Sequence, residues 1–389
     1  MHKHADVVVI GGGFAGFWAA VAARRAGGPE LSIAVVTPND SLVMRPRLYE
    51  ANPETLAMPL AEPFAMIDVD LIPIRATSID ADSRLVRLSD GTDIGFGSAV
   101  LAIGSVMRVP VLPGIEHAFS IDDQASAIVL DGRLSDIAHQ PTVRIAVIGA
   151  GFTGIELALE LPSRLRQHDR TEALAPVEVV LIDRAPVVGP ELGDGPRAEI
   201  EAALDEQRVD RCLGATVVAI APTSVDFADG SCLEVDAVVM CTGMAAASLA
   251  DPLDGERDAL GRYIVGATLE HPQFSGVFLT GDMASADTGT GHRTLQSCQH
   301  ALQLGRTAGE NAARRFLGHD LIDYQQPAYV TCLDLGDHGA VRTTGWDREV
   351  VETGASAKAI KQFINQQVIY PDLSGGPEGL LLQSQPGRR

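Results

Sequence analysis

The sequence predicts an α/β protein in which one strand–helix–strand unit occurs twice in tandem, followed by a small C-terminal α+β section. Two repeats carry this prediction. The segment Gly11-Gly-Gly-Phe-Ala-Gly16 recurs as Gly149-Ala-Gly-Phe-Thr-Gly154, 138 residues later. The turn Asp90-Gly91 recurs as Asp229-Gly230, 139 residues later. Because the two offsets agree within one residue, the chain contains two copies of one architecture.

Each copy begins with an apolar strand that leads directly into its glycine-rich turn. A helix and a second apolar strand follow, which indicates a parallel strand pair joined by a right-handed crossover. The Asp-Gly turns lie between short strand-like runs and predict hairpins. The expected strands are 7–10, 31–36, 144–148 and 177–182, and the expected helices are 14–26 and 152–166.

The rest of the chain predicts one more strand and helix of the same body and then a third section. The third section begins near residue 319, and its amphipathic helix packs either on its own chain or on a second subunit in a homodimer. The tail, rich in Gly, Pro, Ser and Gln, is expected to be poorly ordered at its end. These elements are a strand within 276–282, a helix over 294–317, strands near 329–335 and 339–344, a helix over 355–368 and the tail 371–389.

Composition excludes several classes of protein. The 389 residues include 30 basic and 51 acidic ones, a formal net charge of −21, which argues against nucleic acid and anionic membranes as electrostatic partners. Five cysteines without a close pair disfavour a disulfide scaffold and a structural metal site, and they fit the cytoplasm. The longest uncharged stretch, 7–23, has glycines at its centre and is too short for a membrane span.

A Gly-x-Gly-x-x-Gly turn between a strand and a helix is typical of Rossmann-like dinucleotide-binding domains. The first glycine allows the tight turn, the second lets the backbone approach a diphosphate, and the third lets helix and strand pack closely. The helix N-terminus then offers unpaired N–H groups to the phosphates. The expected cofactor-binding residues are Gly11, Gly13, Phe14, Ala15 and Gly16 in the first turn, and Gly149, Gly151, Phe152, Thr153 and Gly154 in the second.

An acidic residue at the end of the second strand of such a unit hydrogen-bonds the ribose and repels a 2′-phosphate. Asp183 has this place in the second copy, which favours NAD(H) over NADP(H), although the adjacent Arg184 offers a partner for a phosphate. Thr37 stands at the corresponding place of the first copy, followed by Pro38. Its hydroxyl can hydrogen-bond a ribose, but more weakly than a carboxylate would.

With these motifs the chain resembles the glutathione-reductase-like flavoproteins with two dinucleotide-binding domains. The resemblance covers about residues 5–318 and includes the turns Ala102-Ile-Gly104 and Cys241-Thr242-Gly243 and the pair Gly281-Asp282. It implies that the first copy binds FAD, with Asp282 on its ribityl chain, and that the second binds NAD(P)H. The implied domains are 1–112 with 252–318 for FAD, 113–251 for NAD(P), and a C-terminal interface section, 319–389.

Disulfide reductases of this fold carry redox cysteines soon after the first strand–helix–strand, whereas residues 41–50 contain none and the first cysteine is Cys212. The loop with Arg45-Pro46 is instead similar to the flavin loop of type II NADH dehydrogenases, which reduce quinones. Gly151-Phe-Thr-Gly-Ile-Glu156 is similar to their NADH motif, and the segment 294–299 to their flavin turn. We expect Cys298 and Cys332 to be buried structural residues.

This resemblance implies a small set of catalytic residues, because the cofactors carry the electrons. Glu156 would orient the nicotinamide or supply protons; the alternative is a solvated charge at the helix end. Backbone N–H groups near Leu295 and Gln296 would support negative charge on the flavin. His292 would pass protons to an acceptor; the alternative is a surface loop histidine.

The sequence therefore predicts an FAD-dependent oxidoreductase that passes electrons from NADH to a quinone-type acceptor without redox-active cysteines. One alternative is a flavoenzyme acting on another small organic substrate in a biosynthetic pathway, and another is a non-catalytic NADH/FAD redox sensor. The expected location is the cytoplasm, with at most peripheral contact at the inner face of a membrane.

Overall fold

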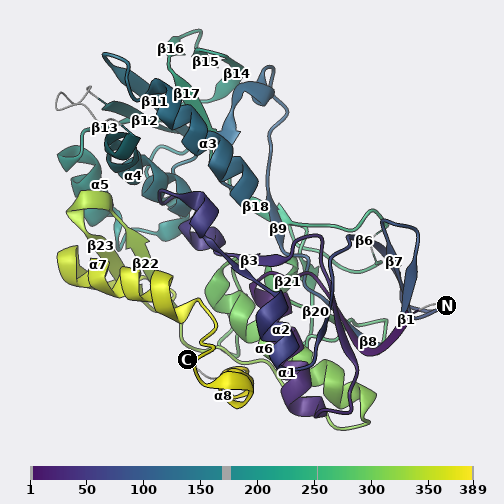
Figure 1. Cartoon of the computed structure of the whole chain (residues 1–389). Coiled ribbons are helices and arrows are strands. Elements are labelled where there is room, and N and C mark those ends of the chain that lie inside the picture. The colour runs from purple at the N-terminus through teal and green to yellow at the C-terminus, as the bar shows by residue number, and fades with distance from the viewer. Residues whose placement is uncertain (1–2, 169–176, 252, 388–389) are drawn as a thin grey trace.

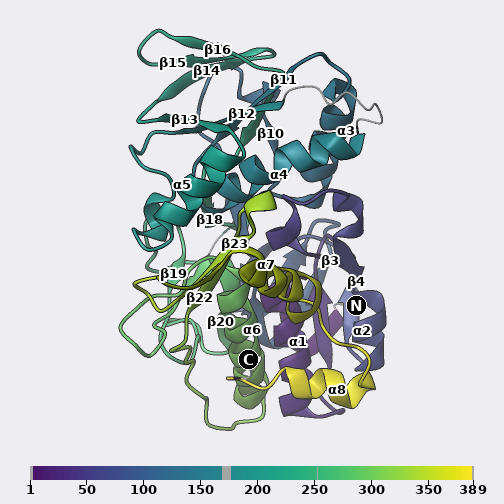
Figure 2. The ribbon, with the colours of Figure 1, turned by 90° about the vertical axis from the view of Figure 1, so that its left-hand side faces the viewer.

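The computed structural model describes residues 3–168, 177–251 and 253–387, and the statements below concern these ranges. Figure 1 and Figure 2 show two α/β units, one above the other, with the C-terminal section lying along one side of both. The predicted α/β class and tandem arrangement are therefore confirmed. The division into domains at the predicted boundaries stays a prediction.

The first unit is built on a sheet whose central strand, β1 (Lys3–Ile10), follows directly from the apolar run before the first glycine turn. β1 pairs in parallel with β2 (Ile33–Val36) and β8 (Asp93–Leu101), and the strand order is β5-β2-β1-β8-β7-β6, with β20 also pairing with β8. The remaining elements are α1 (Phe14–Gly27), β3 (Ser41–Val43), β4 (Ala57–Pro59), α2 (Ala61–Met66), β5 (Asp70–Ile72), β6 (Ala76–Asp80), β7 (Leu85–Leu88), β20 (Val277–Leu279) and α6 (Cys298–Phe316).

The second unit repeats this plan. Its parallel sheet has the order β10-β17-β11-β12-β13, and a separate antiparallel sheet, β14-β15-β16, contains the predicted second hairpin. The elements are β10 (Phe119–Ser120), α3 (Gln124–Ile137), β11 (Val143–Ile148), α4 (Phe152–His168), β12 (Val177–Asp183), α5 (Arg197–Glu206), β13 (Val209–Leu213), β14 (Val217–Ala221), β15 (Ser224–Phe227), β16 (Cys232–Glu234) and β17 (Ala237–Met240).

Two chain segments connect the units, and they pair with each other. β9 (Ser105–Met107) leaves the first unit, β18 (Met244–Ala246) returns from the second, and the two are antiparallel. A short parallel pair, β19 (Tyr263–Ile264) and β21 (Ala284–Ser285), follows the return. The paired connection holds both glycine turns near one junction.

The C-terminal section is a three-stranded antiparallel sheet with helices. It comprises β22 (Val330–Asp334), β23 (Ala340–Thr344), β24 (Glu349–Thr353), α7 (Gly354–Phe363) and a π-helical turn, Ile364–Val368. A further helix, α8 (Gly376–Gln383), packs on α1 and α2, and its Leu380 is fully buried. The tail is thus ordered over most of its length, because Leu380 anchors it. Its last two residues, 388–389, lie outside the described residues, so the poorly ordered end stays a prediction.

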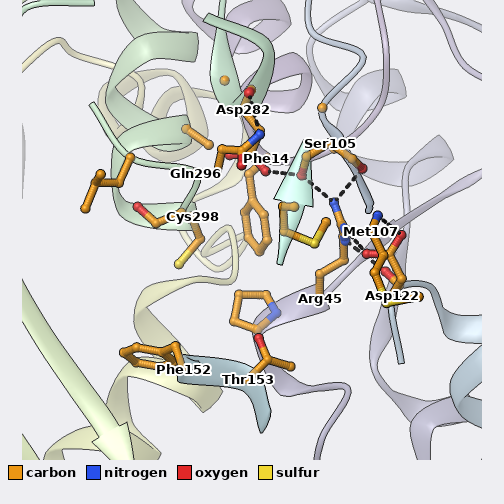
Figure 3. Close-up of a pocket in the computed structure, with 18 of the residues that line it drawn as sticks. Phe14, Arg45, Ser105, Met107, Asp122, Phe152, Thr153, Asp282, Gln296 and Cys298 are labelled. Atoms are coloured by element: carbon orange, nitrogen blue, oxygen red, sulfur yellow. Dashed lines mark hydrogen bonds and ion pairs between the residues drawn. The ribbon is translucent and has the colours of Figure 1, made fainter. Parts of the chain in front are cut away.

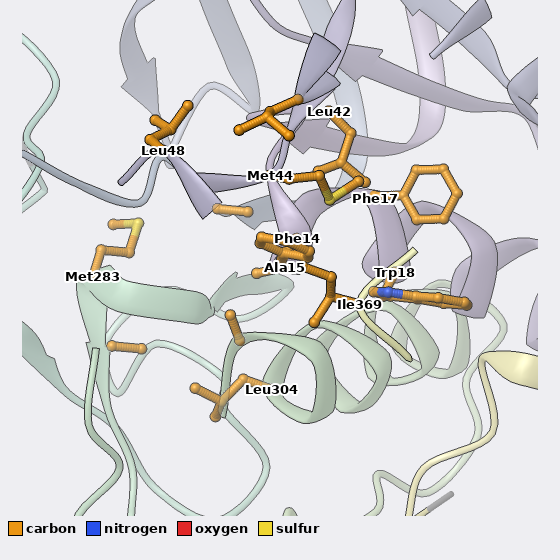
Figure 4. Packing of buried hydrophobic residues seen from close by; sticks show 14 of the residues in the cluster. Phe14, Ala15, Phe17, Trp18, Leu42, Met44, Leu48, Met283, Leu304 and Ile369 are labelled. Carbon is orange, nitrogen blue, oxygen red and sulfur yellow. The ribbon is translucent and has the colours of Figure 1, made fainter. Parts of the chain in front are cut away.

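The core of the first unit depends on close contact between α1 and α6. A Cβ at Gly305 would lie 2.3 Å from the carbonyl oxygen of Ala15, and one at Gly309 would lie 2.0 Å from that of Ala19. Small residues at this spacing let the two backbones touch. Around α1, Phe17 stacks on Phe64 with 5.4 Å between ring centroids. Figure 4 shows Phe14, Phe17 and Trp18 of α1 among other buried apolar side chains. This packing fixes the N-terminus of α1, where the first glycine turn lies.

One predicted boundary is wrong in a way that affects the site. The helix expected over 294–317 begins only at Cys298, because the Ser297 side chain caps it and the N–H of Thr294 is bonded to the carbonyl of Ala286 instead. Within the described residues no helix combines the length and apolar character needed to cross a membrane.

Candidate functional site

A single chamber of about 3040 Å³ lies where the two units and the C-terminal section meet. Both glycine turns open into it, as do β9, the start of α6 and the π-helical turn. Most predicted site residues line it, and the exceptions are discussed below. Those that do are Gly11, Gly13, Phe14, Ala15, Thr37, Pro38, Arg45, Pro46, Ala102, Gly104, Gly149, Gly151, Phe152, Thr153, Glu156, Asp183, Arg184, Thr242, Gly243, Gly281, Asp282, Leu295 and Gln296.

The first glycine turn is tightly packed at its first and third glycines and open at its second. Gly11 has a φ of 112°, and a Cβ there would lie 2.3 Å from the carbonyl oxygen of Ala102, so only glycine fits. Gly16 does not line the chamber, since it packs against the carbonyl of Gly11. A Cβ at Gly13, in contrast, would meet no protein atom within 4 Å, and α1 has no side-chain cap. The N-terminus of α1 therefore faces open space.

The second glycine turn repeats these contacts almost atom for atom. Gly149 has a φ of 114°, and a Cβ there would lie 2.1 Å from the carbonyl oxygen of Cys241. A Cβ at Gly154 would lie 1.8 Å from the carbonyl oxygen of Gly149. Gly154, like Gly16, packs helix against strand rather than lining the chamber. The third glycine thus has the structural role expected of it in both copies.

Asp183 has a function that the sequence did not indicate. One carboxylate oxygen accepts a hydrogen bond from the N–H of Ala150, inside the glycine turn, at 2.7 Å, and the other accepts from Ala185 at 2.8 Å. Asp183 therefore fastens the turn while facing the chamber. Arg184 is exposed, and Thr37 is buried at the end of β2, where its hydroxyl adjoins Gly12.

A polar chain joins the predicted flavin residues to the connection between the units (Figure 3). Ser105 donates from Oγ to Asp282 at 2.6 Å, and Arg45 donates to Ser105 at 3.2 Å and to Asp122 at 2.5 Å. Burial raises the pKa of Asp282, opposed by the hydrogen bond from Ser105 and by the Arg45 charge. Arg45 thus ties the loop predicted to contact the flavin to the segment that leads into α3.

Because α6 starts later than predicted, Leu295 and Gln296 do not supply its first helical N–H groups, and their predicted role at the flavin stays a prediction. Leu295 and Gln296 precede the helix, and Gln296 uses its side-chain amide to bond the carbonyl of Asp282 at 3.0 Å. The first backbone N–H groups of α6 belong to Cys298 and Gln299, both of which line the chamber. Support of negative charge would therefore come from these two amides.

Glu156 is buried and ion-paired, so the alternative of a solvated helix-end charge is wrong. It is 4% exposed, and its Oε1 lies 2.8 Å from Nζ of Lys361 on α7 and accepts the N–H of Asp334 at 2.9 Å. Burial raises the pKa of Glu156 to about 7, although Lys361 favours its ionised form. A carboxyl group with this pKa can take up or release a proton near neutral pH.

Lys361 and Asp334 are functional candidates that the sequence analysis missed. Asp334 accepts a hydrogen bond from the Tyr49 hydroxyl at 3.1 Å and pairs with Lys358. One turn after Glu156, burial beside Asp334 also raises the pKa of Glu160 to about 7. The available signal was Lys361 itself, a charged residue among the apolar positions of the 355–368 helix.

His292 does not belong to this site. It is exposed, stacks on Trp346 with ring centroids 4.5 Å apart, and does not line the chamber. The alternative of a surface loop histidine is therefore correct, and the proton-transfer role is withdrawn.

The cysteines of the chamber are poor nucleophiles. Cys241, Cys298 and Cys332 line it, and all five cysteines are free thiols. Cys298 and Cys332 are half-buried rather than buried as expected, because they face the chamber. Burial raises the pKa of Cys298 to about 11 and that of Cys332 to about 11. Because the thiolate is the reactive form, these side chains stay inert at neutral pH. Among the described residues, no cluster of His, Cys, Asp and Glu could hold a metal ion.

Comparison with known proteins agrees with this geometry. The family model for pyridine nucleotide-disulphide oxidoreductases matches residues 5–305. The NADH dehydrogenase-like protein Rv1812c of Mycobacterium tuberculosis is 40% identical over 98% of this chain and 98% of its own length. Demethylphylloquinone reductase NdbB of Synechocystis is 26% identical over 86% of this chain and 85% of its own length.

Solved structures show the same fold. A ferredoxin reductase from Rhodopseudomonas palustris superposes with a TM-score of 0.72 at 26% identity, covering 87% of this chain and 82% of its own. The sulfide:quinone oxidoreductase of Aquifex aeolicus superposes with a TM-score of 0.75 at 20% identity, covering 94% and 90%. The chain therefore belongs to the pyridine nucleotide-disulphide oxidoreductase family and is an NADH dehydrogenase-like flavoprotein oxidoreductase.

Proposed function

We propose that the chain passes electrons from NADH through FAD to a quinone-type acceptor, without redox-active cysteines. The observation that carries the proposal is that both glycine turns open into one chamber whose wall also contains the buried Glu156–Lys361 pair. Two dinucleotides bound there would meet beside a group that exchanges protons near neutral pH. Quinone reduction needs two electrons and two protons, which is the combination that this arrangement can deliver.

The residues of the first unit fit FAD. The open space at Gly13 and the uncapped N-terminus of α1 suit a diphosphate, which would accept hydrogen bonds from the free N–H groups. Asp282, with a raised pKa, would bind the ribityl hydroxyls, and Thr37 the adenosine ribose. When bound, the flavin supplies hydride acceptance and electron transfer. The amides of Cys298 and Gln299 would stabilise negative charge on it.

The second unit would bind NADH, with Asp183 on the ribose and the N-terminus of α4 on the diphosphate. Glu156 stands at the start of the second turn of α4, beside Phe152 and Thr153 at the chamber wall. Its buried carboxyl group would hold a proton below about pH 7 and release it to the acceptor side. Lys361 would keep the ionised form inside the protein after that release.

The acceptor would enter from the side of the C-terminal section. Phe363, Val368 and Leu382 are exposed apolar side chains on this section, which would favour peripheral contact with the inner face of a membrane from the cytoplasm. A second candidate is a flavoenzyme with a polar organic substrate. It is favoured by Arg342, Arg348 and Gln326, polar side chains that also line the chamber.

Anaerobic titration with NADH tests the proposal. The purified protein should be yellow, release FAD on denaturation, lose its flavin absorbance on addition of NADH and regain it with menadione or ubiquinone-1. Bleaching without reoxidation by either quinone would favour the polar-substrate enzyme. If NADH does not reduce the flavin absorbance after reconstitution with FAD, NADH is not the electron donor and the proposal is refuted as a whole.

A further inference from the structure

The two glycine turns differ at one position, and the difference points to a residue that sets the affinity for the nucleotide. At Gly13 an added Cβ would meet nothing within 4 Å, but at the corresponding Gly151 it would meet Oε1 of Glu191 at 2.4 Å. The same oxygen accepts a hydrogen bond from the N–H of Phe152 at 3.3 Å. In the second unit, a carboxylate of the chain itself therefore covers the N-terminus of the helix.

The backbone that carries Glu191 is firmly attached to the glycine turn. Glu191 lies in a 3₁₀ turn, Pro190–Leu192, flanked by Gly189 and Gly193, which have φ values of 55° and 72°. Leu192 is buried, and Gly189 donates its N–H to the carbonyl of Ala150 at 2.8 Å. The Glu191 side chain is exposed, so it can rotate away while its backbone stays in place.

A carboxylate and a diphosphate compete for this location. The N-terminus of a helix attracts negative charge through its unpaired N–H groups and its dipole. The second glycine of the motif is the one that lets the backbone approach a diphosphate, and Glu191 lies against that glycine. A dinucleotide would have to displace the carboxylate, and the displaced charge would remain near the phosphates.

We propose that Glu191 is an internal competitor of the nucleotide that lowers the affinity of the second glycine turn for NADH. The inference rests on the proposed function, in that the second unit binds NADH. The second turn would therefore bind its nucleotide more weakly than the first turn, where no atom of the described residues lies within 4 Å of a Cβ at Gly13. A low affinity suits NADH, whose oxidised product must leave after each turnover, while the first turn would retain FAD.

Glu191→Gln tests this with little risk to folding, because the side chain is exposed. The variant keeps the shape and removes the charge, so NADH and ADP-ribose should bind about two- to fivefold more tightly, the range expected for one charge at a helix N-terminus. The difference from the wild type should shrink at high salt, since exposed charges are screened. ADP-ribose is the better probe because it lacks the nicotinamide and cannot reduce the flavin.

Binding of ADP-ribose would be measured by calorimetry on the FAD-loaded protein, with Glu201→Gln, an exposed glutamate of α5, as the matched control. A tighter Glu191→Gln variant beside an unchanged control supports the proposal. Equal or weaker binding by Glu191→Gln overturns it, and weaker binding would mean that Glu191 contacts the nucleotide favourably. If the wild type binds neither ADP-ribose nor NADH, the proposed function fails instead.

Discussion

Replacing Asp183 by alanine tests whether one carboxylate both fastens the second glycine turn and selects the nucleotide. Its two oxygens accept the N–H groups of Ala150 and Ala185 at 2.7 and 2.8 Å. Ala150 is fully buried, whereas Ala185 is half-buried. The substitution should therefore change both stability and cofactor preference, and the two effects can be measured separately.

The loss of stability follows from the N–H group left behind. A buried donor without an acceptor costs about 1–3 kcal/mol, and a hydrogen bond to a charged group contributes about 1.5–3 kcal/mol. The N–H of the half-buried Ala185 can hydrogen-bond water instead, so it adds little to the loss of stability. We expect Asp183→Ala to lower the free energy of unfolding by about 2–3 kcal/mol, most of it from Ala150.

The effect on the nucleotide is of similar size. Two charge-assisted hydrogen bonds from the ribose contribute about 2–4 kcal/mol together, so kcat/KM for NADH should fall about 30- to 900-fold. The value for NADPH should fall less, because the variant also loses the repulsion between Asp183 and the 2′-phosphate. The preference for NADH over NADPH should shrink accordingly.

Urea unfolding and steady-state kinetics with both nucleotides measure the two effects. Asp183→Asn keeps one acceptor oxygen and should lose less stability than Asp183→Ala, while Asp210→Ala, an exposed aspartate on the adjacent strand β13, should lose almost none. An unchanged free energy of unfolding in Asp183→Ala would refute the fastening of the turn. A wild type that prefers NADPH would show that Arg184 outweighs Asp183.

Three further outcomes are expected. Glu156→Gln should remove a single-proton step near pH 7 from the pH dependence of flavin reduction or reoxidation, measured by stopped-flow absorbance. In the wild type, the folded pKa of about 7 against 4.5 means that the stability contributed by Glu156 is complete below pH 4.5 and is lost as the pH rises through 7. A difference between the two proteins that does not change with pH would contradict this assignment. Gly13→Ala should fold with wild-type circular dichroism but retain less FAD, because its methyl group enters open chamber space, whereas Gly11→Ala should misfold. The double variant Cys298→Ser with Cys332→Ser should keep quinone reductase activity; complete loss of turnover in a folded protein would reinstate a thiol step.

Local features were predictable from the sequence, and long-range pairings were not. Gly11 and Gly149 indicate their turns in the sequence because only glycine fits there. Each has a φ above 110° and a carbonyl oxygen within 2.5 Å of the Cβ position. The start of α6 differs from the predicted start, although Thr and Ser both belong to the residue types that cap helices. In the structure Ser297 is the cap, because the N–H of Thr294 bonds the carbonyl of Ala286, a contact that the sequence does not indicate. The partner of Glu156 is 205 residues away in sequence, at Lys361, and no local pattern indicates such a contact.

The C-terminal section decides the environment of Glu156, although it lies outside both nucleotide-binding repeats. It supplies Lys361 as the cation and the Asp334 N–H as the donor to that carboxylate, while Tyr49 from the flavin loop of the first unit bonds Asp334 from the other side. Three separate parts of the chain thus converge on one buried carboxyl group. In the proposed function, the two repeats and the start of α6 would bind the dinucleotides, whereas the third section would bury and pair Glu156 for proton exchange near neutral pH. Relatives that share the repeats and differ in this section should therefore share their nucleotides and differ in the acceptors that they reduce.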